Sequence, residues 1–273
     1  MSEKTILILG GGIGGQVAAN RLASLLKGQD RIIVVDKGKN FAFPPSFPWI
    51  AVGQRNPAKI QKPLAALFKK GVTLVQAEIL KIDPNAKKVE TSAGPLSFDY
   101  LLISLGAELV PGKIPGFQEG ALNFYTLEGS IQIQKSLKNF DQRKIALLIT
   151  STPFKCPAAP YELAFLIQDF LKQKHQKAEV AVFTPEPFPM PTAGPGVGET
   201  LKQMLESNGI GFYPGHKVAN INPEGRTILF EGGKKEDYDL LIGIPPHEAP
   251  KVVKESGLTN ESGWIPVNRQ TLE

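Results

Sequence analysis

Three glycines near the amino terminus have the spacing of a phosphate-binding turn. Gly10, Gly12 and Gly15 fall in the pattern G-x-G-x-x-G, directly after a short apolar run at residues 6–9. Gly10 allows a tight turn out of a strand, Gly12 lets backbone amides approach a pyrophosphate, and Gly15 lets the following helix pack closely on the sheet. The N–H groups at the start of that helix would then point at the phosphates.

The residues that follow these glycines complete a βαβ unit. Apolar residues recur at helical spacing from Ala18 to Leu26, and Gly28 is placed to end the helix. A buried strand at residues 32–35 comes next and ends on Asp36, at about the distance where this motif places a carboxylate for ribose hydroxyls. A glycine-rich turn without a ligand is the simpler interpretation, but the strand, helix and acid in register favour a dinucleotide site.

The lone cysteine, Cys156, is the second residue that could carry chemistry. It lies in the segment 151–162, STPFKCPAAPYE, between a predicted buried strand at 144–150 and a predicted helix. The positive end of that helix dipole and the neighbouring Lys155 favour the thiolate, which is the nucleophilic form. The alternative role is that of a small buried hydrophobic residue, and the residues alone leave both roles open.

The same segment contains no glycine. Pro153, Pro157 and Pro160 cannot present the amide donors that a pyrophosphate needs, so we expect this second unit to keep the fold without binding NAD. Glu162, in the first helical turn, has a simpler role as a carboxylate that stabilises the helix dipole. The three histidines are scattered and show no metal-ligand spacing, so we assign no metal.

The composition is that of a soluble globular protein. With 42% hydrophobic and 21% charged residues, the 273 residues are enough for two domains of ordinary size. The net charge of +5 is spread along the sequence without a basic block, so no nucleic-acid partner is indicated. One cysteine excludes an internal disulfide framework, the first strand follows Met1 without room for a secretory signal, and no apolar run could span a bilayer. We therefore expect a cytoplasmic protein.

The order of the predicted elements indicates an α/β protein with two tandem Rossmann-like βαβ domains, the second inserted into the first. The segment 110–120 is dense in proline and glycine and is our candidate boundary. We assign residues 1–110 to the first part of a dinucleotide-binding domain, 111–238 to a second domain without a nucleotide glycine motif, and 239–273 to an incomplete return to the first.

Two segments of the first half carry local predictions. The prolines and aromatic residues between Phe41 and Trp49 predict a rigid loop rather than a helix, and residues 59–70, closed by Gly71, predict a helix. The loop has two interpretations, because it could pack on its own domain or run along a bound flavin.

Three segments together resemble the sulfide:quinone oxidoreductases, within the FAD-dependent pyridine nucleotide disulfide oxidoreductase superfamily. FPPSFPWIAVG at 43–53 is similar to their proline and tryptophan loop, and KCPAAPYE at 155–162 is similar to their redox cysteine loop. The last 19 residues, ESGLTNESGWIPVNRQTLE, resemble the segment that leads into their second flavin-binding strand. The resemblance extends from Thr5 to Glu273 and implies the FAD/NAD(P)-binding fold of the glutathione-reductase type.

The resemblance also implies roles for particular residues. Cys156 would be the sulfur carrier and flavin-side thiol, and Glu162 the carboxylate that handles the proton. Asp36 would hold the adenosine ribose of FAD, and its charge would repel the 2′-phosphate of NADP. The other residues implied to contact FAD are Gly10, Gly12, Ile13, Gly14 and Gly15 around the pyrophosphate, Lys37 beside Asp36, Pro45 and Ser46 at the flavin, the backbone of Glu78 and Ile79 at the adenine, and Leu105 and Gly106 along the cofactor.

The implied activity is oxidation of sulfide at a cysteine pair, with two electrons passed through FAD to a quinone. Members of the family continue past the length of this chain with a Gly-Asp motif, a second redox cysteine and amphipathic helices at the quinone site. They also often have a cysteine where this chain has Tyr125. Because Cys156 has no second thiol to pair with, we expect the 273-residue chain to reduce little or no quinone with sulfide.

Three other functions stay open. The cysteine loop also resembles that of flavocytochrome c sulfide dehydrogenase flavoproteins. A type II NADH dehydrogenase is disfavoured by the second unit without glycines, and the single cysteine would suit a flavin-binding or scaffold protein without turnover. The implied partners are sulfide and a quinone as small-molecule substrates. The resemblance leaves open a peripheral contact with the cytoplasmic face of a membrane, through a C-terminal region absent from this chain, and a homo-oligomer.

Overall fold

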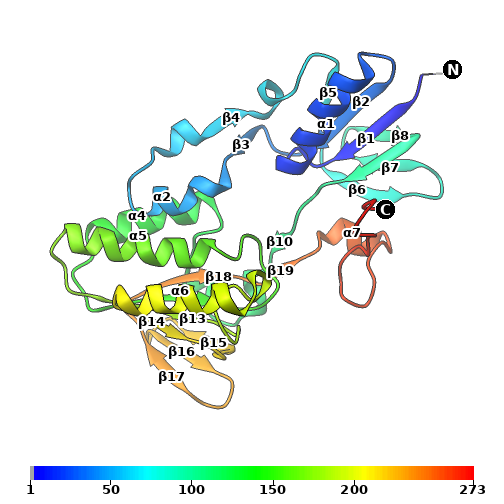
Figure 1. Ribbon diagram of the computed structural model, residues 1–273. Helices are drawn as coiled ribbons and strands as arrows, with labels where there is room; N and C mark the ends of the chain where they lie inside the picture. The colour runs from blue at the N-terminus through cyan, green and yellow to red at the C-terminus, as the bar shows by residue number, and fades with distance from the viewer. Residues whose placement is uncertain (1–2) are drawn as a thin grey trace. The chain divides into compact units, whose positions relative to one another are not determined.

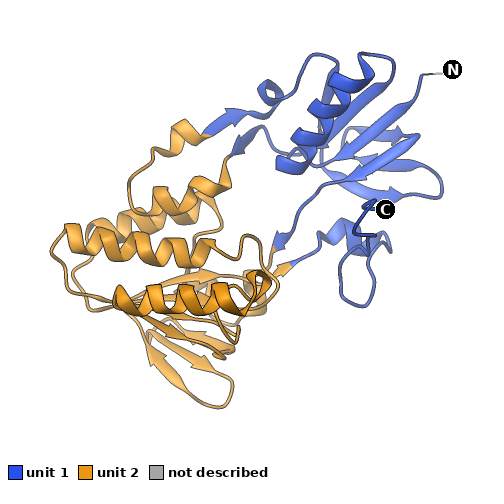
Figure 2. Ribbon diagram, in the orientation of Figure 1, with its two compact units in different colours: residues 1–42, 61–108, 248–273 blue, residues 43–60, 109–247 orange. Residues whose placement is uncertain are grey.

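The computed structural model describes residues 3–273, and the chain divides into two compact units (Figure 2). Unit 1 comprises residues 1–42, 61–108 and 248–273, and unit 2 comprises residues 43–60 and 109–247. The predicted fold class, α/β with two Rossmann-like domains, is confirmed, because each unit is built on a parallel sheet. The domain limits drawn from the sequence stay a prediction, and they did not anticipate that residues 43–60 group with the second unit.

Unit 1 is a four-stranded parallel sheet with different layers on its two faces (Figure 1). Alternate side chains of the central strands point to opposite faces, so Ile8 and Val34 pack under helix α1, whereas Leu9 and Val35 pack against an antiparallel layer. Burial on both faces explains the unbroken apolar runs of these strands. The sheet contains, in spatial order, β5 (Val72–Gln76), β2 (Arg31–Asp36), β1 (Thr5–Leu9) and β9 (Tyr100–Ile103), and α1 is Ile13–Leu26.

The remaining elements of unit 1 are short. The antiparallel layer is β6 (Ile79–Asp83), β7 (Lys88–Thr91) and β8 (Gly94–Ser97), and helix α7 (Lys251–Glu255) packs on β6. Strand β3 (Asn40–Ala42) pairs with β4 (Gln61–Pro63), which leads into the 3-10 turn η3 (Leu64–Leu67). The chain passes between the two units at β10 (Glu108–Leu109) and again at β19 (His247–Glu248), two short strands that pair with each other.

Unit 2 is a five-stranded parallel sheet covered by helices on one face and by a small antiparallel sheet on the other. Ile145, Leu147 and Ile149 pack toward the helices, and Ala146 and Leu148 pack toward the antiparallel sheet. The strands are, in spatial order, β11 (Leu122–Asn123), β18 (Leu240–Ile244), β12 (Lys144–Ile149), β13 (Glu179–Phe183) and β14 (Ile210–Tyr213). The helices on the first face are α2 (Phe47–Ala51), α4 (Leu127–Lys138), α5 (Ala159–Gln173) and α6 (Pro195–Ser207). On the other face, the short helix α3 (Phe117–Gly120) packs with the antiparallel sheet, which is β15 (Val218–Asn222), β16 (Thr227–Phe230) and β17 (Lys235–Asp237). Four 3-10 turns complete the unit: η1 (Pro44–Ser46), η2 (Pro57–Ile60), η4 (Pro111–Lys113) and η5 (Pro191–Ala193).

Two local predictions from the sequence were wrong. The segment 41–49 is not only a loop, because helix α2 begins at Phe47 and carries Pro48 in its first turn, where a missing N–H costs no hydrogen bond. Residues 59–70 are not one helix, because Pro63 interrupts them and the part around Lys62 pairs with β3 instead. Helix α2 packs on α4 and α5 and so belongs to the core of unit 2.

Candidate dinucleotide and thiol sites

The glycine turn of unit 1 is closed so tightly that two positions exclude any side chain. Gly10 has a φ of 99°, and a Cβ there would overlap the carbonyl of Ser104 at the end of β9. A Cβ on Gly15 would overlap the carbonyl oxygen of Gly10. These contacts match the roles expected for the first and third glycines, which are a tight turn and close packing of the helix on the sheet.

The middle of the turn is open. Nothing lies within 4 Å of the position that a Cβ on Gly12 would take, and Gly12 is the N-cap of α1. Among residues 3–273, no side chain caps this helix, and the N–H groups of Ile13 and Gly14 precede the first helical bond, which runs from Gln16 N to Gly12 O at 2.9 Å. An open space in front of uncapped amides at a helix start is the geometry that binds a phosphate.

Asp36, at the end of β2, is bound by backbone donors on both of its oxygens. Its Oδ2 accepts from Gly11 N at 2.6 Å, and its Oδ1 accepts from Gly38 N at 2.7 Å. The carboxylate therefore fixes the glycine turn to the next strand. Each carboxylate oxygen can accept a second hydrogen bond, so the contact with a ribose hydroxyl that the sequence predicts is compatible with this geometry.

The other residues predicted to contact the cofactor lie as follows. Lys37 Nζ is 4.0 Å from Glu78 Oε1 at the surface, and both backbone polar groups of Glu78 bond to Ser92 at 2.9 Å. Ile79 begins β6, while Leu105 and Gly106 follow β9 beside the glycine turn. Pro45 and Ser46 form the turn η1 of unit 2, where Ser46 is buried and its Oγ accepts from Arg55 at 2.8 Å. The roles of these residues toward FAD stay predictions.

Cys156 is exposed on the loop that follows β12. Its backbone has a φ of 50°, a left-handed conformation that costs a non-glycine residue about 1–2 kcal/mol. Such a residue persists only where its surroundings determine it. Two contacts do so: the Cys156 carbonyl accepts from Ala159 N at 3.0 Å, and the Tyr125 hydroxyl lies 3.2 Å from the same carbonyl.

Glu162 lies in the first turn of α5 and is held by the proline and tryptophan loop. Trp49 Nε1 donates to Glu162 Oε1 at 2.9 Å, and the Arg55 guanidinium lies over the Trp49 ring at 5.6 Å. No local sequence pattern indicates this contact, because the two residues are 113 positions apart. It joins two segments that the resemblance had singled out separately.

The counterpart of a nucleotide site in unit 2 is closed by its own side chains. Glu186 follows β13, where a nucleotide-binding unit would place a ribose-binding acid, but it is buried and its Oε2 accepts from Tyr161 at 2.7 Å and from Thr184 at 3.2 Å. Burial raises the pKa of Glu186 despite these two donors. The loop between β12 and α5 carries prolines in place of glycines, so this unit offers neither the amide cradle nor a free acid.

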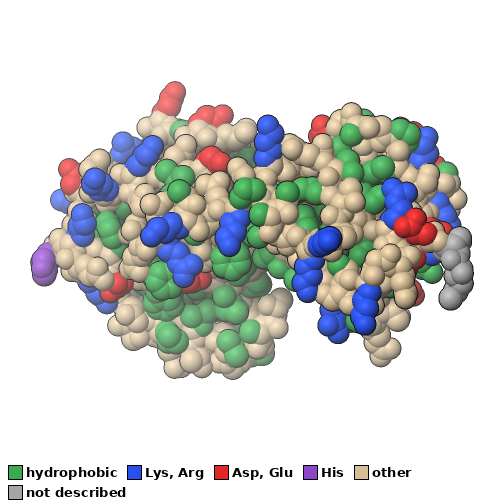
Figure 3. All heavy atoms as spheres, turned by 90° about the horizontal axis from the view of Figure 1, so that it is seen from above, with side chains coloured by type: hydrophobic (Ala, Val, Ile, Leu, Met, Phe, Trp, Pro, Cys, Tyr) green, Lys and Arg blue, Asp and Glu red, His purple; other side chains and the backbone are tan. Residues whose placement is uncertain are grey.

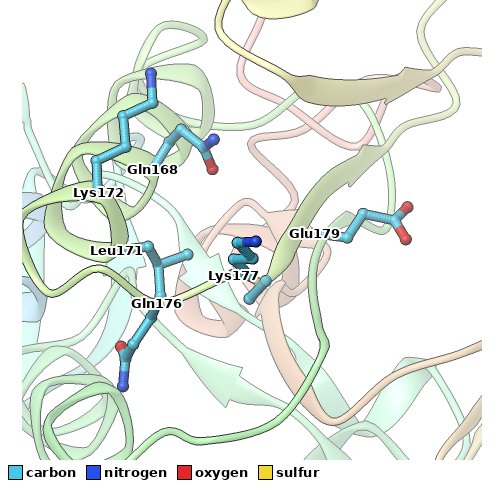
Figure 4. Close-up of a pocket in the computed structure, with 7 residues that line it drawn as sticks. Gln168, Leu171, Lys172, Gln176, Lys177 and Glu179 are labelled. Atoms are coloured by element: carbon cyan, nitrogen blue, oxygen red, sulfur yellow. The ribbon is translucent and has the colours of Figure 1, made fainter.

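Two hollows of about 450 Å³ each lie on unit 2, at opposite edges of its sheet. One adjoins the Cys156 loop at the carboxyl ends of β12 and β13 and is lined by Phe154, Pro157 and Glu186, among others. The other lies at the start of β13, where Gln168 and Lys172 extend from α5 and Glu179 from the strand (Figure 4). Open α/β sheets bind ligands at the carboxyl ends of their strands, so the first hollow has the position expected for function.

His247 follows β18 and is a buried polar residue that sequence reasoning did not select. It is 7% exposed, and its Nδ1 lies 2.9 Å from the Pro245 carbonyl, which suits the neutral ring that carries its proton on Nδ1. Within the described part of the chain, its Nε2 is buried without a hydrogen-bond partner. Burial lowers the pKa of His247 to about 4, and the nearby charge of Lys155 acts in the same direction.

The described residues show neither a basic patch on the face in Figure 3 nor a cluster of metal-binding side chains. On the face shown in Figure 3, Lys and Arg side chains are scattered rather than gathered into one patch. Over residues 3–273, no group of three or more His, Cys, Asp and Glu side chains could hold a metal ion. No helix in that range is both long and apolar enough to cross a membrane.

Comparison with known proteins identifies the family. A sequence model of the pyridine nucleotide-disulphide oxidoreductases matches residues 4–148, and the chain belongs to that family. A second model, for the central part of the flavoprotein chain of flavocytochrome c sulfide dehydrogenase, matches residues 131–245.

Particular relatives bear the name that the sequence segments suggested. Mitochondrial sulfide:quinone oxidoreductase of Mus musculus is 22% identical over 98% of this chain and 62% of its own length. Sulfide-quinone reductase of Aquifex aeolicus is 26% identical over 93% of this chain and 61% of its own. The crystal structure of the Aquifex aeolicus sulfide:quinone oxidoreductase superposes with a TM-score of 0.85 at 24% identity, over 97% of this chain and 65% of that one. The resemblance to these oxidoreductases is confirmed, and the chain spans less than two thirds of the length of these relatives.

Proposed function

We propose that this chain is the FAD-binding and redox-cysteine portion of a flavoprotein that oxidises sulfide and passes the electrons to a quinone. The observation that carries the proposal is the exposed Cys156, held in a left-handed conformation at the carboxyl edge of the sheet of unit 2. The names of the relatives support the same substrates. An exposed thiol can meet a small anionic sulfur species without any opening of the fold.

The residues present fit the ADP half of FAD. The open space at Gly12, the uncapped start of α1 and the carboxylate of Asp36 supply the three features that a dinucleotide requires of this fold. FAD, when bound, supplies a two-electron acceptor. In the proposed site, the amides of Ile13 and Gly14 would bind the pyrophosphate and Asp36 the ribose.

The roles proposed for unit 2 are those of a sulfur carrier and a proton acceptor. Paired in a disulfide with a second thiol from a longer form, Cys156 Sγ would be attacked by sulfide; the new S–S bond replaces the disulfide bond, and the second sulfur leaves as a thiolate. Glu162 would accept a proton, and because its Oε1 is engaged by the Trp49 indole, the atom proposed for proton transfer is Oε2. Trp49 would then fix the direction of that carboxylate.

The test has two arms. FAD titration should give saturable quenching of flavin fluorescence, and a site that instead selects NADP would contradict the assignment. Sulfide-dependent reduction of a soluble quinone is then measured on this chain and on any longer natural form, with Cys156→Ser as the inactive control. A longer form that binds FAD but reduces quinone with NADH and not with sulfide would refute the proposed substrate.

A second candidate function is favoured by one observation, the match of residues 131–245 to the flavocytochrome c sulfide dehydrogenase flavoprotein. In that case the electron acceptor would be a haem protein rather than a quinone. Replacing the quinone by cytochrome c in the same sulfide assay separates the two functions. We further propose a cytoplasmic location at the membrane face where a quinone is available, which cell fractionation would test.

A further inference from the structure

Three neighbouring parallel strands of unit 2 bring three unusual side chains to one edge of the sheet. Strand β18 pairs in parallel with β11 on one side and with β12 on the other, so the carboxyl ends of all three meet at the same edge. Tyr125 follows β11, His247 follows β18 and Cys156 lies on the loop after β12. The chain order reverses between β12 and β18, and this is the point at which open α/β sheets bind their ligands.

Tyr125 links this edge to the Cys156 loop through its hydroxyl. The phenolic oxygen lies 2.5 Å from the carbonyl oxygen of Lys155 and 3.2 Å from that of Cys156, so a single O–H is shared between two consecutive carbonyls. A hydroxyl bound to two adjacent peptide groups restrains both the position and the rotation of the backbone between them. That backbone includes the Cα from which the thiol extends.

The rest of Tyr125 is anchored independently of the loop. Its N–H donates to Asn123 Oδ1 at 3.0 Å. Its ring makes edge contacts with Phe124 at 4.6 Å and with the buried His247 at 5.3 Å between centroids. The hydroxyl therefore projects from a fixed ring, and it can hold the loop in place rather than follow its motion.

The hydroxyl stays a donor over the whole working range of pH. Burial and the neighbouring Cys156 raise the pKa of Tyr125 above its ordinary value, so the phenol does not ionise near neutrality. A phenolate could not donate to a carbonyl and would repel a thiolate. The residue thus suits a permanent structural donor and not an acid or base that changes state during turnover.

We propose that Tyr125 is a positioning residue for Cys156. Its hydroxyl, bound to the carbonyls of Lys155 and Cys156, keeps the Cys156 backbone in the left-handed conformation and the thiol exposed. The proposal rests on the proposed function for the part that concerns sulfide, and on the geometry of unit 2 alone for the part that concerns the loop. It assigns to Tyr125 a role that depends on one oxygen atom and not on the ring.

The test compares Tyr125→Phe with a matched hydroxyl deletion elsewhere in unit 2. Tyr125→Phe keeps the ring contacts and removes only the hydroxyl. Tyr238→Phe is the control, because over the described residues the Tyr238 hydroxyl is buried without a hydrogen-bond partner, so its loss breaks no such bond. Since Cys156 is the only cysteine, a nitroxide spin label attaches there without any further substitution.

The first two readouts are independent of catalysis. In Tyr125→Phe we expect the rotational correlation time of the label to fall at least about twofold, and the amide of Ala159, which bonds to the Cys156 carbonyl, to exchange at least about tenfold faster. Tyr238→Phe should leave both unchanged. Unchanged exchange across the sheet strands of unit 2 establishes that Tyr125→Phe is folded, and a label and an Ala159 amide that behave as in the wild type would overturn the proposal.

The third readout uses the longest form that turns over sulfide. Tyr125→Phe should lower kcat about tenfold with KM within twofold, because a mispositioned Cys156 sulfur affects the chemical step more than substrate capture. A freed loop with unchanged kcat would overturn the positioning role. If the loop is freed but the wild type shows no sulfide activity at all, the restraint by Tyr125 stands and the proposed function fails, so the two failures are distinguishable.

Discussion

Replacing His247 by Asn should reduce the stability that unit 2 loses at acid pH. The folded protein lowers the pKa of His247 to about 4 from its ordinary 6.5, so between these two values the unfolded chain binds more protons than the folded one. The free energy of unfolding is therefore highest above pH 6.5 and falls as the pH drops through this window to about 4. Asn does not titrate, and its side-chain amide can still donate to the Pro245 carbonyl that lies against Nδ1 in the wild type.

The size of the effect follows from the shift. A pKa difference of about 2.5 units, at about 1.4 kcal/mol per unit, amounts to about 3.5 kcal/mol in full. About 3 kcal/mol of this unfolding free energy is lost between pH 7 and pH 4, because the folded-state ring is only about half protonated at pH 4. The His247 side chain is only 7% exposed, so solvent screens this free-energy difference little. Glu186 acts in the opposite direction, because its raised pKa favours the folded state as the pH falls, and it is common to both proteins.

The assay is urea unfolding at pH 7, 5.5 and 4, followed by tryptophan fluorescence in a Trp264→Phe background, so that the signal comes from Trp49 in unit 2. We expect the wild type to lose about 3 kcal/mol more than His247→Asn between pH 7 and pH 4. Asn also loses the edge contact with Tyr125, so a uniform decrease in stability is expected at every pH and does not bear on the argument. If the two pH profiles run parallel, His247 does not bury a neutral ring and the reasoning is wrong.

Four further predictions concern the two candidate sites. Gly15→Ala should unfold or strongly destabilise unit 1, because its Cβ would overlap the Gly10 carbonyl. Gly12→Ala should leave thermal stability unchanged and weaken FAD binding at least tenfold. Equal melting temperatures for the two variants would contradict this prediction. Trp49→Phe removes the donor to Glu162 and should cost about 1 kcal/mol in urea unfolding, and a free energy of unfolding equal to that of the wild type would mean that the contact is not formed in solution. NADH titration should give no saturable signal, since Glu186 is engaged by Tyr161 and the adjacent loop lacks glycines, and rapid flavin reduction by NADH would show that this loop has been misread. Iodoacetamide should modify the native chain once, at the exposed Cys156. The 273-residue chain should reduce little quinone with sulfide, and a rate equal to that of a longer form, abolished by Cys156→Ser, would refute the two-thiol route.

The sequence predicted the parts of the fold that depend on local pattern. Both parallel sheets were identified from the apolar runs at β1, β2, β12 and β13 and from the glycine spacing before α1. A strand buried on both faces is an unbroken apolar run, which is easy to recognise in a sequence. The helix expected at 59–70 failed because Pro63 and pairing with β3 outweighed its helical apolar spacing. The helix α2 was missed because prolines in a first turn look like loop residues when the helix is only five residues long.

The candidate sites divide in the same way. Gly10, Gly15 and Asp36 could be selected because their roles follow from backbone sterics and spacing along the chain. Tyr125, His247 and the Trp49–Glu162 contact could not, because they arise from strand order and from segments more than a hundred residues apart. Tyr125 and His247 could have been selected only from a prediction that the carboxyl ends of β11, β18 and β12 lie side by side.

Helix α2 has a consequence for how the protein is made. Ala51 and Val52 lie in the core of unit 2, yet they are synthesised before most of unit 1, and the last part of unit 1 follows unit 2 in the chain. Neither unit is a continuous piece of sequence, so a growing chain cannot complete one before beginning the other. A fragment that starts at residue 109 would leave apolar surface on α4 and α5 uncovered, and we expect such a fragment to aggregate during expression. The segment 43–60 thus has to wait for residues 109–247 to be synthesised before its apolar side chains can be covered.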